Sequence, residues 1–190
     1  MTIRHLLIAL LLALATIISG CANYTPRIAA SEQPGVNDAY LYGRFSIETR
    51  KEFFGIDGYT TMGFAIECVD GKRYVIRFDK DTPLQAVKIK PSVCSWVQIV
   101  YSNADGQLMS QKPAPAGSMS SMKIKRSQAY YFGDFHAAFT SQGCGYRTAC
   151  LNWRIDGARD NFSSASDELN NTFPRLATLP KSKVDSLLLR

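Results

Sequence analysis

The stretch of sequence that decides the fold runs from Thr60 to Phe78 and reads TTMGFAIECVDGKRYVIRF. Its first half alternates apolar with other residues, the period-two pattern of a half-buried strand. Asp70 and Gly71 follow, and a second run rich in β-branched and aromatic residues extends from Arg73 to Phe78. An Asp-Gly pair between two such runs favours a type I′ turn, because both turn positions require a positive φ. The sequence therefore predicts a β-hairpin here.

Similar short apolar runs recur along most of the chain. They predict strands at Ala39–Thr49, Leu84–Lys90, Cys94–Ser102, Met122–Lys125, Ala129–Phe139 and Leu151–Ile155. We expect Leu84–Lys90 to pair with Cys94–Ser102, and Met122–Lys125 to pair with Ala129–Phe139, because a short turn separates the members of each pair. Lys-Ile-Lys precedes the turn in both pairs, which indicates one supersecondary unit used twice. Residues 111–121 are rich in proline, glycine and serine and predict a loop.

One helix is predicted near the C-terminus, at about residues 160–172. Four apolar residues fall there at helical spacing: Phe162, Ala165, Leu169 and Phe173. Asp160 or Asn161 would cap the helix and Pro174 would stop it. Strands without intervening helices indicate a mainly β fold, an antiparallel β-sandwich, with this helix on an edge or end. The last ten residues, 181–190, are expected to add a helical turn or to fray.

The N-terminus predicts export. Arg4 and His5 precede an apolar run from Leu6 to Ile18, which is shorter than the roughly 20 residues needed to cross a bilayer and is typical of a signal peptide. The following residues, Ile18-Ser19-Gly20-Cys21, resemble the lipobox of bacterial lipoproteins. This resemblance implies that signal peptidase II removes residues 1–20 and that Cys21 carries the lipid. The alternative is a soluble secreted protein cleaved nearby.

The resemblance also implies a location. Ala22 stands where an aspartate marks inner-membrane retention in enteric-type lipoproteins, so we expect the cell outer membrane. Residues 21–36 contain two prolines without periodicity and predict a lipidated tether, followed by the sandwich domain at 37–190. The signal peptide contains one basic residue, Arg4, and no acid, so its removal lowers the net charge from +6 to +5. This modest charge outside the cytoplasm does not favour a nucleic-acid partner.

Four cysteines remain besides Cys21, an even number in an exported chain of 190 residues. Oxidation is the default outside the cytoplasm, so two disulfides are expected. We favour Cys144 with Cys150, because the glycines beside Cys144 let the short segment turn back, and Cys68 with Cys94 by elimination. A zinc site made of the same thiols is less favoured, because no Cys-x2-Cys spacing is present.

The mature region as a whole resembles uncharacterised bacterial lipoproteins with transthyretin-like or immunoglobulin-like β-sandwiches. The resemblance rests on the lipobox, on the segment Ala129–Phe135 after a Lys-Ile-Lys strand, and on Asp160-Asn161 with Leu169 and Pro174. It implies the sandwich fold and a role in the cell envelope. It brings no catalytic signature, and no cofactor or metal site is nominated.

Two groups of residues are candidates for binding. Lys88, Lys90, Lys123 and Lys125 would form a basic face for anionic head groups if their strands lie close together, although solvated edge lysines that discourage aggregation explain them equally. Phe53 and Phe54 lie between predicted strands and could form an exposed patch for a protein partner.

We therefore expect a non-catalytic binding or accessory module, anchored in the outer membrane through Cys21, with its domain in the periplasm or at the cell surface. The first alternative is a hydrolase using His136 and Asp134, which would share one face of a strand, with a serine such as Ser141, Ser163 or Ser164. The sequence has no nucleophile elbow to support it. The second alternative is a periplasmic carrier of an apolar ligand.

Overall fold

The computed structural model describes residues 24–51, 61–79, 84–102, 108–113, 121–145 and 148–184. Within them the chain forms strands β1 (Ala39–Lys51), β2 (Thr61–Cys68), β3 (Arg73–Asp79), β4 (Leu84–Ile89), β5 (Ser92–Ser102), β6 (Leu108–Pro113), β7 (Met122–Ile124), β8 (Gln128–Gly145), β9 (Thr148–Arg159) and β10 (Lys181–Lys183). Helix α2 (Phe162–Thr172) and the short 3-10 helix η1 (Pro174–Leu176) precede β10. The predicted mainly β class with one helix near the C-terminus is confirmed.

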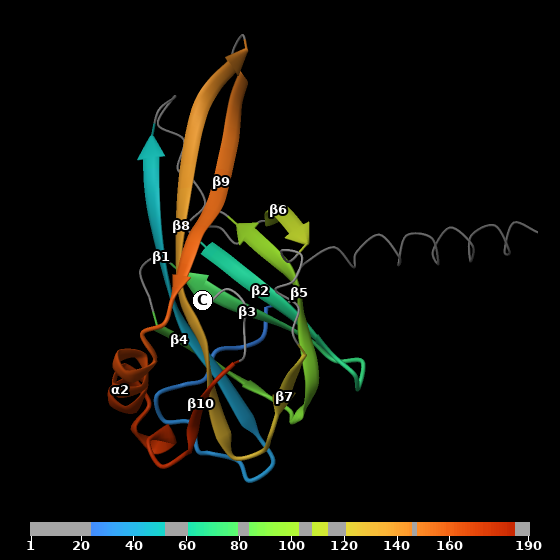
Figure 1. Cartoon of the computed structure of the whole chain (residues 1–190), viewed down its shortest axis with the longest axis vertical. Coiled ribbons are helices and arrows are strands. Elements are labelled where there is room, and N and C mark those ends of the chain that lie inside the picture. The colour runs from blue at the N-terminus through green and yellow to red at the C-terminus, as the bar shows by residue number, and fades with distance from the viewer. Residues whose placement is uncertain are drawn as a thin grey trace, which may run out of the picture.

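The strands form two sheets (Figure 1). Sheet A has the order β10-β8-β1-β4, with β9 also paired to β8, and sheet B has the order β3-β2-β5-β6, with β7 also paired to β5. Sheet B is antiparallel throughout, as predicted. Sheet A is mixed, because β1 and β10 both run parallel to β8. The strands of sheet B lie between β1 and β8 in the sequence, and this long connection lets β8 return in the same direction as β1.

The β2–β3 hairpin is confirmed, but the predicted type I′ turn is wrong: Gly71 has a φ of 77°, whereas the φ of Asp70 is not positive. The two other predicted hairpins are wrong. β4 pairs with β1 in sheet A whereas β5 belongs to sheet B, and β7 pairs with β5 whereas β8 belongs to sheet A. The residues between β4 and β5, and those between β7 and β8, therefore carry the chain from one sheet to the other. A turn signal predicts a change of direction but not the sheet that the next strand joins.

Three smaller expectations change. Residues 111–113, expected in a loop, belong to β6, and residues 181–183 form β10 beside β8 where a helical turn was expected. Helix α2 lies where it was predicted, but it packs on the outer face of sheet A and not on an edge or end. Its buried residues Ala165 and Leu169 share one cluster with Tyr40, Tyr42 and Tyr131 of β1 and β8. These tyrosines give the outer face of sheet A an apolar surface on which the helix packs.

The main core fills the space between the sheets and is rich in aromatic rings. The Phe64 ring centroid lies 4.3 Å from that of Phe135, 4.8 Å from that of Trp96 and 5.1 Å from that of Phe132. Phe64, Trp96, Phe132 and Phe135 are all at most 3% exposed. The tilted and edge-to-face packing of these rings is the arrangement that aromatic pairs prefer. This core holds sheet A on sheet B.

A bulge between β1 and β8 determines which side chains face outward. The register shifts after Tyr42, so that Gly43 pairs with Gly133, whose φ is 134°. Before the bulge Phe132 faces the core, and after it Phe135 does. An ideal Cβ on Gly43 would lie 2.6 Å from the carbonyl oxygen of Gly133, so the two backbones approach too closely for a side chain. The bulge turns Asp134 to the outer face of sheet A.

The predicted tether is wrong for residues 24–36, which pack on the domain. We call this segment the N-terminal strap. Thr25 N–H donates to the Val75 carbonyl at 2.9 Å on β3, and Ile28 N–H donates to the Ala86 carbonyl at 3.1 Å on β4. β3 and β4 are edge strands of sheets B and A, and their unpaired backbone groups bind a further segment. The strap therefore spans the two sheet edges.

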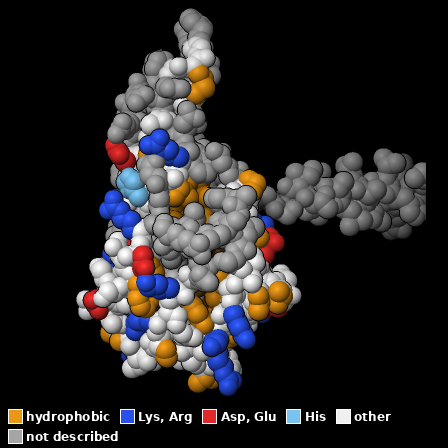
Figure 2. All heavy atoms as spheres, viewed as in Figure 1, with side chains coloured by type: hydrophobic (Ala, Val, Ile, Leu, Met, Phe, Trp, Pro, Cys, Tyr) orange, Lys and Arg blue, Asp and Glu red, His pale blue; other side chains and the backbone are white. Residues whose placement is uncertain are grey.

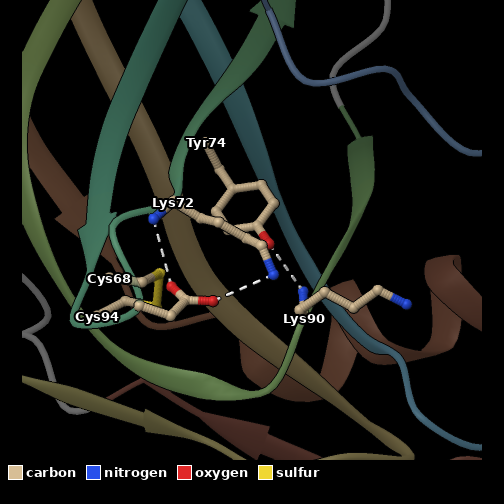
Figure 3. The surroundings of a disulfide bond; sticks show 6 residues. Cys68, Lys72, Tyr74, Lys90 and Cys94 are labelled. Atoms are coloured by element: carbon tan, nitrogen blue, oxygen red, sulfur yellow. Dashed lines mark hydrogen bonds and ion pairs between the residues drawn. A yellow bond between two sulfur atoms is a disulfide. The ribbon is translucent and has the colours of Figure 1, made fainter.

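Both disulfides form in the predicted pairing, Cys68 with Cys94 and Cys144 with Cys150. Cys68 and Cys94 stand directly opposite each other on β2 and β5, with a Cα–Cα distance of 3.9 Å (Figure 3). Figure 3 also shows Tyr74 nearby, whose hydroxyl oxygen accepts a hydrogen bond from the Lys90 N–H at 3.1 Å. This bond connects β3 to the residue at which the chain leaves sheet A. The other disulfide staples the end of the β8–β9 hairpin.

Candidate binding site on sheet A

A hollow of about 350 Å³ opens on the outer face of sheet A, beside the start of α2. We call it the sheet A groove. β1 and β8 supply its floor, and β9 and the residue before α2 supply its wall. Its lining residues are Arg44, Phe45, Ser46, Asp134, Phe135, His136, Arg159 and Asn161. Figure 2 shows a pale blue histidine on this part of the molecule with blue basic side chains above and below it.

Asp134 is the centre of a hydrogen-bond network at the groove. The Tyr131 hydroxyl donates to its Oδ1 at 2.8 Å, and the Asn161 side-chain amide donates to its Oδ2 at 2.9 Å. Arg44 Nη1 lies 3.3 Å from Oδ2 and its other nitrogen, Nη2, lies 2.7 Å from Glu168. The carboxylate of Asp134 is thus held by donors from β1, from β8 and from the residue before α2. The network fixes the start of α2 on β1 and β8.

His136 has a serine partner that the sequence did not indicate. The Ser46 hydroxyl lies 2.9 Å from His136 Nδ1, within hydrogen-bond distance. The parallel register of β1 and β8 places Ser46 directly opposite His136. Of the serines nominated from the sequence, Ser164 accepts a hydrogen bond from Arg44 at 3.1 Å, Ser163 is exposed on α2, and the side chain of Ser141 lies outside the described residues.

Two tyrosines, Tyr42 of β1 and Tyr131 of β8, are buried under α2 beside the groove. Burial raises the pKa of Tyr42 to about 12, against the opposing effect of its hydrogen bond with Ser166. Burial also raises the pKa of Tyr131, whose hydroxyl lies beside the negative charge of Asp134. Both hydroxyls therefore stay protonated at neutral pH. They act as fixed hydrogen-bonding groups and not as acids or bases in this pH range.

Positive charge gathers along β9 at the rim of the groove. The register places Arg159 opposite Asp134 and Arg154 opposite Ala138, and both arginines are exposed. An exposed guanidinium is a planar, multidentate donor suited to carboxylate or phosphate groups. Arg159, which lines the groove, offers such donors to an acidic group entering it.

The four candidate lysines do not form one free basic face. Lys88 Nζ lies 2.5 Å from Glu32, and Lys90 Nζ lies 2.6 Å from Asp38. The Glu32 interaction raises the pKa of Lys88. Lys123 and Lys125 stand on or just after β7 in sheet B and are exposed. Two of the four lysines thus hold acidic residues in or next to the strap, and binding by the other two stays a prediction.

The remaining candidates lie outside the described residues: Cys21, Phe53 and Phe54. In the part of the chain that the structure describes, no helix is long and apolar enough to span a membrane. Comparison of the chain with protein-family models and with curated proteins finds no match.

Proposed function

We propose that this protein is an outer-membrane-anchored lipoprotein of the bacterial cell envelope whose β-sandwich is a non-catalytic binding or accessory module. The signal sequence and the lipobox ending at Cys21 support the anchor. Two disulfides are in keeping with an oxidising compartment. The observation that carries the binding role is the sheet A groove. There the exposed Arg159 stands opposite Asp134, whose carboxylate already accepts hydrogen bonds from other residues of the domain.

The arrangement of Asp134 favours binding over catalysis. In a hydrolytic triad the histidine is the base, and the acid accepts a hydrogen bond from its imidazole. Three donors occupy the oxygens of Asp134, and one of them is the guanidinium of Arg44. Arg159 is exposed at the groove and is not among these three donors. We propose that its guanidinium receives a carboxylate or phosphate group of an envelope partner.

The anchor is tested by two variants that differ in destination. Cys21→Ser removes the thiol that would carry lipid, so we expect the protein to leave the membrane fraction. Ala22→Asp keeps the thiol and introduces the residue typical of inner-membrane retention, so we expect it in the inner membrane. Density-gradient separation of the two membranes measures both outcomes. Membrane association that persists in Cys21→Ser contradicts the proposal.

The groove is tested by charge reversal in the anchored, full-length protein. Arg159→Glu places an acid at the groove, whereas Arg175→Glu makes the same change on η1, as a control outside the groove lining. After crosslinking in cells, we expect the crosslinked partner band to be lost in Arg159→Glu and kept in Arg175→Glu. An unchanged band in both variants contradicts a binding role for the groove.

The hydrolase remains a second candidate because of the 2.9 Å contact between Ser46 and His136. A fluorophosphonate probe labels an activated serine covalently, so it distinguishes this function directly. On the proposed binding role the wild-type protein stays unlabelled. Labelling at Ser46 that His136→Ala abolishes would establish the hydrolase. The apolar carrier finds no support in the described core, because the aromatic rings around Phe64 fill the space between the sheets.

A further inference from the structure

The start of the strap is fixed to sheet B. Met62 and Phe64 face the core, so Gly63 between them faces outward, and an ideal Cβ on Gly63 would lie 3.3 Å from the Tyr24 ring. The Arg77 guanidinium stands 5.1 Å from the centroid of the same ring. Two hydrogen bonds of 2.9 Å between Thr25 and Val75 hold the next residue on β3. Tyr24 therefore lies on the outer face of sheet B.

Very little chain separates this fixed point from the lipobox cysteine. Cys21 precedes Tyr24 by three residues. A fully extended residue spans at most about 3.6 Å, so the Cα atoms of Cys21 and Tyr24 lie within about 11 Å of each other. The tether expected from residues 21–36 would have let the domain take every orientation. A lipid on Cys21 restricts the orientation, because only two residues separate Cys21 from the fixed Tyr24.

We infer that lipidated Cys21 seats the outer face of sheet B, around Tyr24 and Arg77, on the phospholipid head groups of the anchoring leaflet, so that the sheet A groove faces away from the membrane. The inference rests on the lipidation in the proposed function and adds the orientation. The strap crosses from β3 to β4, and the groove lies on the outer face of the other sheet. A partner would therefore reach the groove from the aqueous side.

The chemistry of the seated face fits a phospholipid surface. Tyrosine is enriched at the level of the head groups, where its ring lies among the acyl chains and its hydroxyl among polar groups. Arg73 and Arg77 alternate with core-facing residues of β3 and so share the outer face with Tyr24. Their side chains are 48% and 28% exposed, and each also pairs with an acid of sheet B, Arg73 with Glu67 at 3.5 Å and Arg77 with Asp79 at 2.8 Å. Their remaining N–H groups suit lipid phosphates. Arg27, whose exposure is similar, pairs with Asp79 at the end of β3.

Energy transfer to labelled head groups tests the orientation. The full-length acylated protein is reconstituted in vesicles of phosphatidylethanolamine and phosphatidylglycerol that contain an acceptor-labelled lipid. A donor dye is introduced by a noncanonical amino acid at Arg73 on sheet B, or at Asp167 on the exposed side of α2. We expect transfer from position 73 to exceed transfer from position 167 at least about twofold. Equal transfer, or the reverse order, overturns the inference.

A matched variant isolates the role of the short connection. Insertion of twenty glycine and serine residues between Asn23 and Tyr24 keeps the lipid and the strap contacts but frees the domain. We expect the two positions to give nearly equal transfer in this variant. Vesicle flotation and the acyl mass of the same samples are measured in parallel. If the wild type is acylated but both positions give equal transfer, the orientation alone is wrong. If the wild type is not acylated, the proposed function and the orientation are both wrong.

Discussion

Thr25 and Val75 exchange two hydrogen bonds: the Thr25 N–H donates to the Val75 carbonyl, and the Val75 N–H donates to the Thr25 hydroxyl oxygen, each at 2.9 Å. Val75 belongs to β3, the edge strand of sheet B. An open edge is a template for pairing with other chains, and the strap covers it. The strap is thus part of the fold.

Asp79 connects the strap to sheet B and makes stability depend on pH. Burial acts to raise its pKa, but hydrogen bonds from Arg77, Arg27 and Thr61 outweigh burial and lower it. A carboxylate with a lowered pKa in the folded state stabilises the fold above the ordinary pKa near 4, and this contribution is lost as the pH falls through the lowered value. We expect Asp79→Asn to reduce the free energy of unfolding by about 1–2 kcal/mol at pH 7.

Urea unfolding between pH 7 and pH 2 measures this effect. The difference between wild type and Asp79→Asn shrinks toward zero at the acidic end. Asp167→Asn, an exposed carboxylate on α2, makes the same charge change and serves as the control. A difference that stays constant over the whole pH range would show that the carboxylate charge of Asp79 is not what stabilises the strap.

The close approach of β1 and β8 at Gly43 predicts a second stability effect. In Gly43→Ala the new methyl group meets the Gly133 carbonyl oxygen, a backbone atom that moves only with its strand. We expect a loss of about 2 kcal/mol or more in the free energy of unfolding. Gly71→Asn is the control, because asparagine tolerates a positive φ and nothing lies within 4 Å of an added Cβ there. Equal stability of both variants contradicts the tight bulge.

The two disulfides are expected to differ in accessibility. Cys144 is exposed, whereas Cys68 and Cys94 are 7% and 1% exposed. A thiol reductant needs access to sulfur, so Cys144–Cys150 is reduced first in the folded protein. From the length of the closed loops, removing Cys68–Cys94 costs about 3.5 kcal/mol and removing Cys144–Cys150 about 2.4 kcal/mol. Thiol alkylation with peptide mapping gives the order of reduction, and urea unfolding of the paired Cys→Ser variants gives the costs.

Features encoded in short stretches of sequence could be predicted. The Asp70-Gly71 turn, the disulfide beside the glycines at Cys144 and the stripe of α2 each depend on neighbouring residues. The pairing of β4 with β1 and of β7 with β5 could not, because packing between distant segments selects the sheet. Alternating patterns establish that a strand exists but leave its neighbours open.

The residues of the sheet A groove likewise differ in whether they could be predicted from the sequence. Asp134 and His136 could be nominated, since both are polar residues in an aromatic strand. Ser46 could not, because it meets His136 only through a parallel pairing of strands 90 residues apart. Asn161 was identified as a helix cap, yet its amide binds Asp134. The strap was missed because its few apolar residues, such as Ile28, have no periodicity and dock singly.

Tyr42 is expected to limit stability in alkali. Because burial raises its pKa to about 12 from an ordinary value near 10, the neutral form stabilises the fold below pH 10, and this contribution is lost as the pH rises from 10 to about 12. Tyr42→Phe removes this loss. At pH 7 the substitution lowers the free energy of unfolding by about 1 kcal/mol, because it removes the 2.7 Å hydrogen bond between the Tyr42 hydroxyl and Ser166. Urea midpoints at pH 7 and pH 11 measure both effects.

Ser166→Ala is the matched control for Tyr42→Phe. It removes the same hydrogen bond but leaves the tyrosine buried, so its midpoint still falls between pH 7 and pH 11. A fall in Tyr42→Phe as large as that in Ser166→Ala would show that Tyr42 does not contribute to the alkaline loss.

The measurement that most directly tests a lipid-anchored sandwich is the mass of the N-terminal peptide from protein extracted out of membranes. The account predicts a chain that begins at Cys21, with a diacylglyceryl thioether on its sulfur and an acyl group on its amine. A free thiol at Cys21, or a chain that retains residues 1–20 or begins elsewhere, would contradict it.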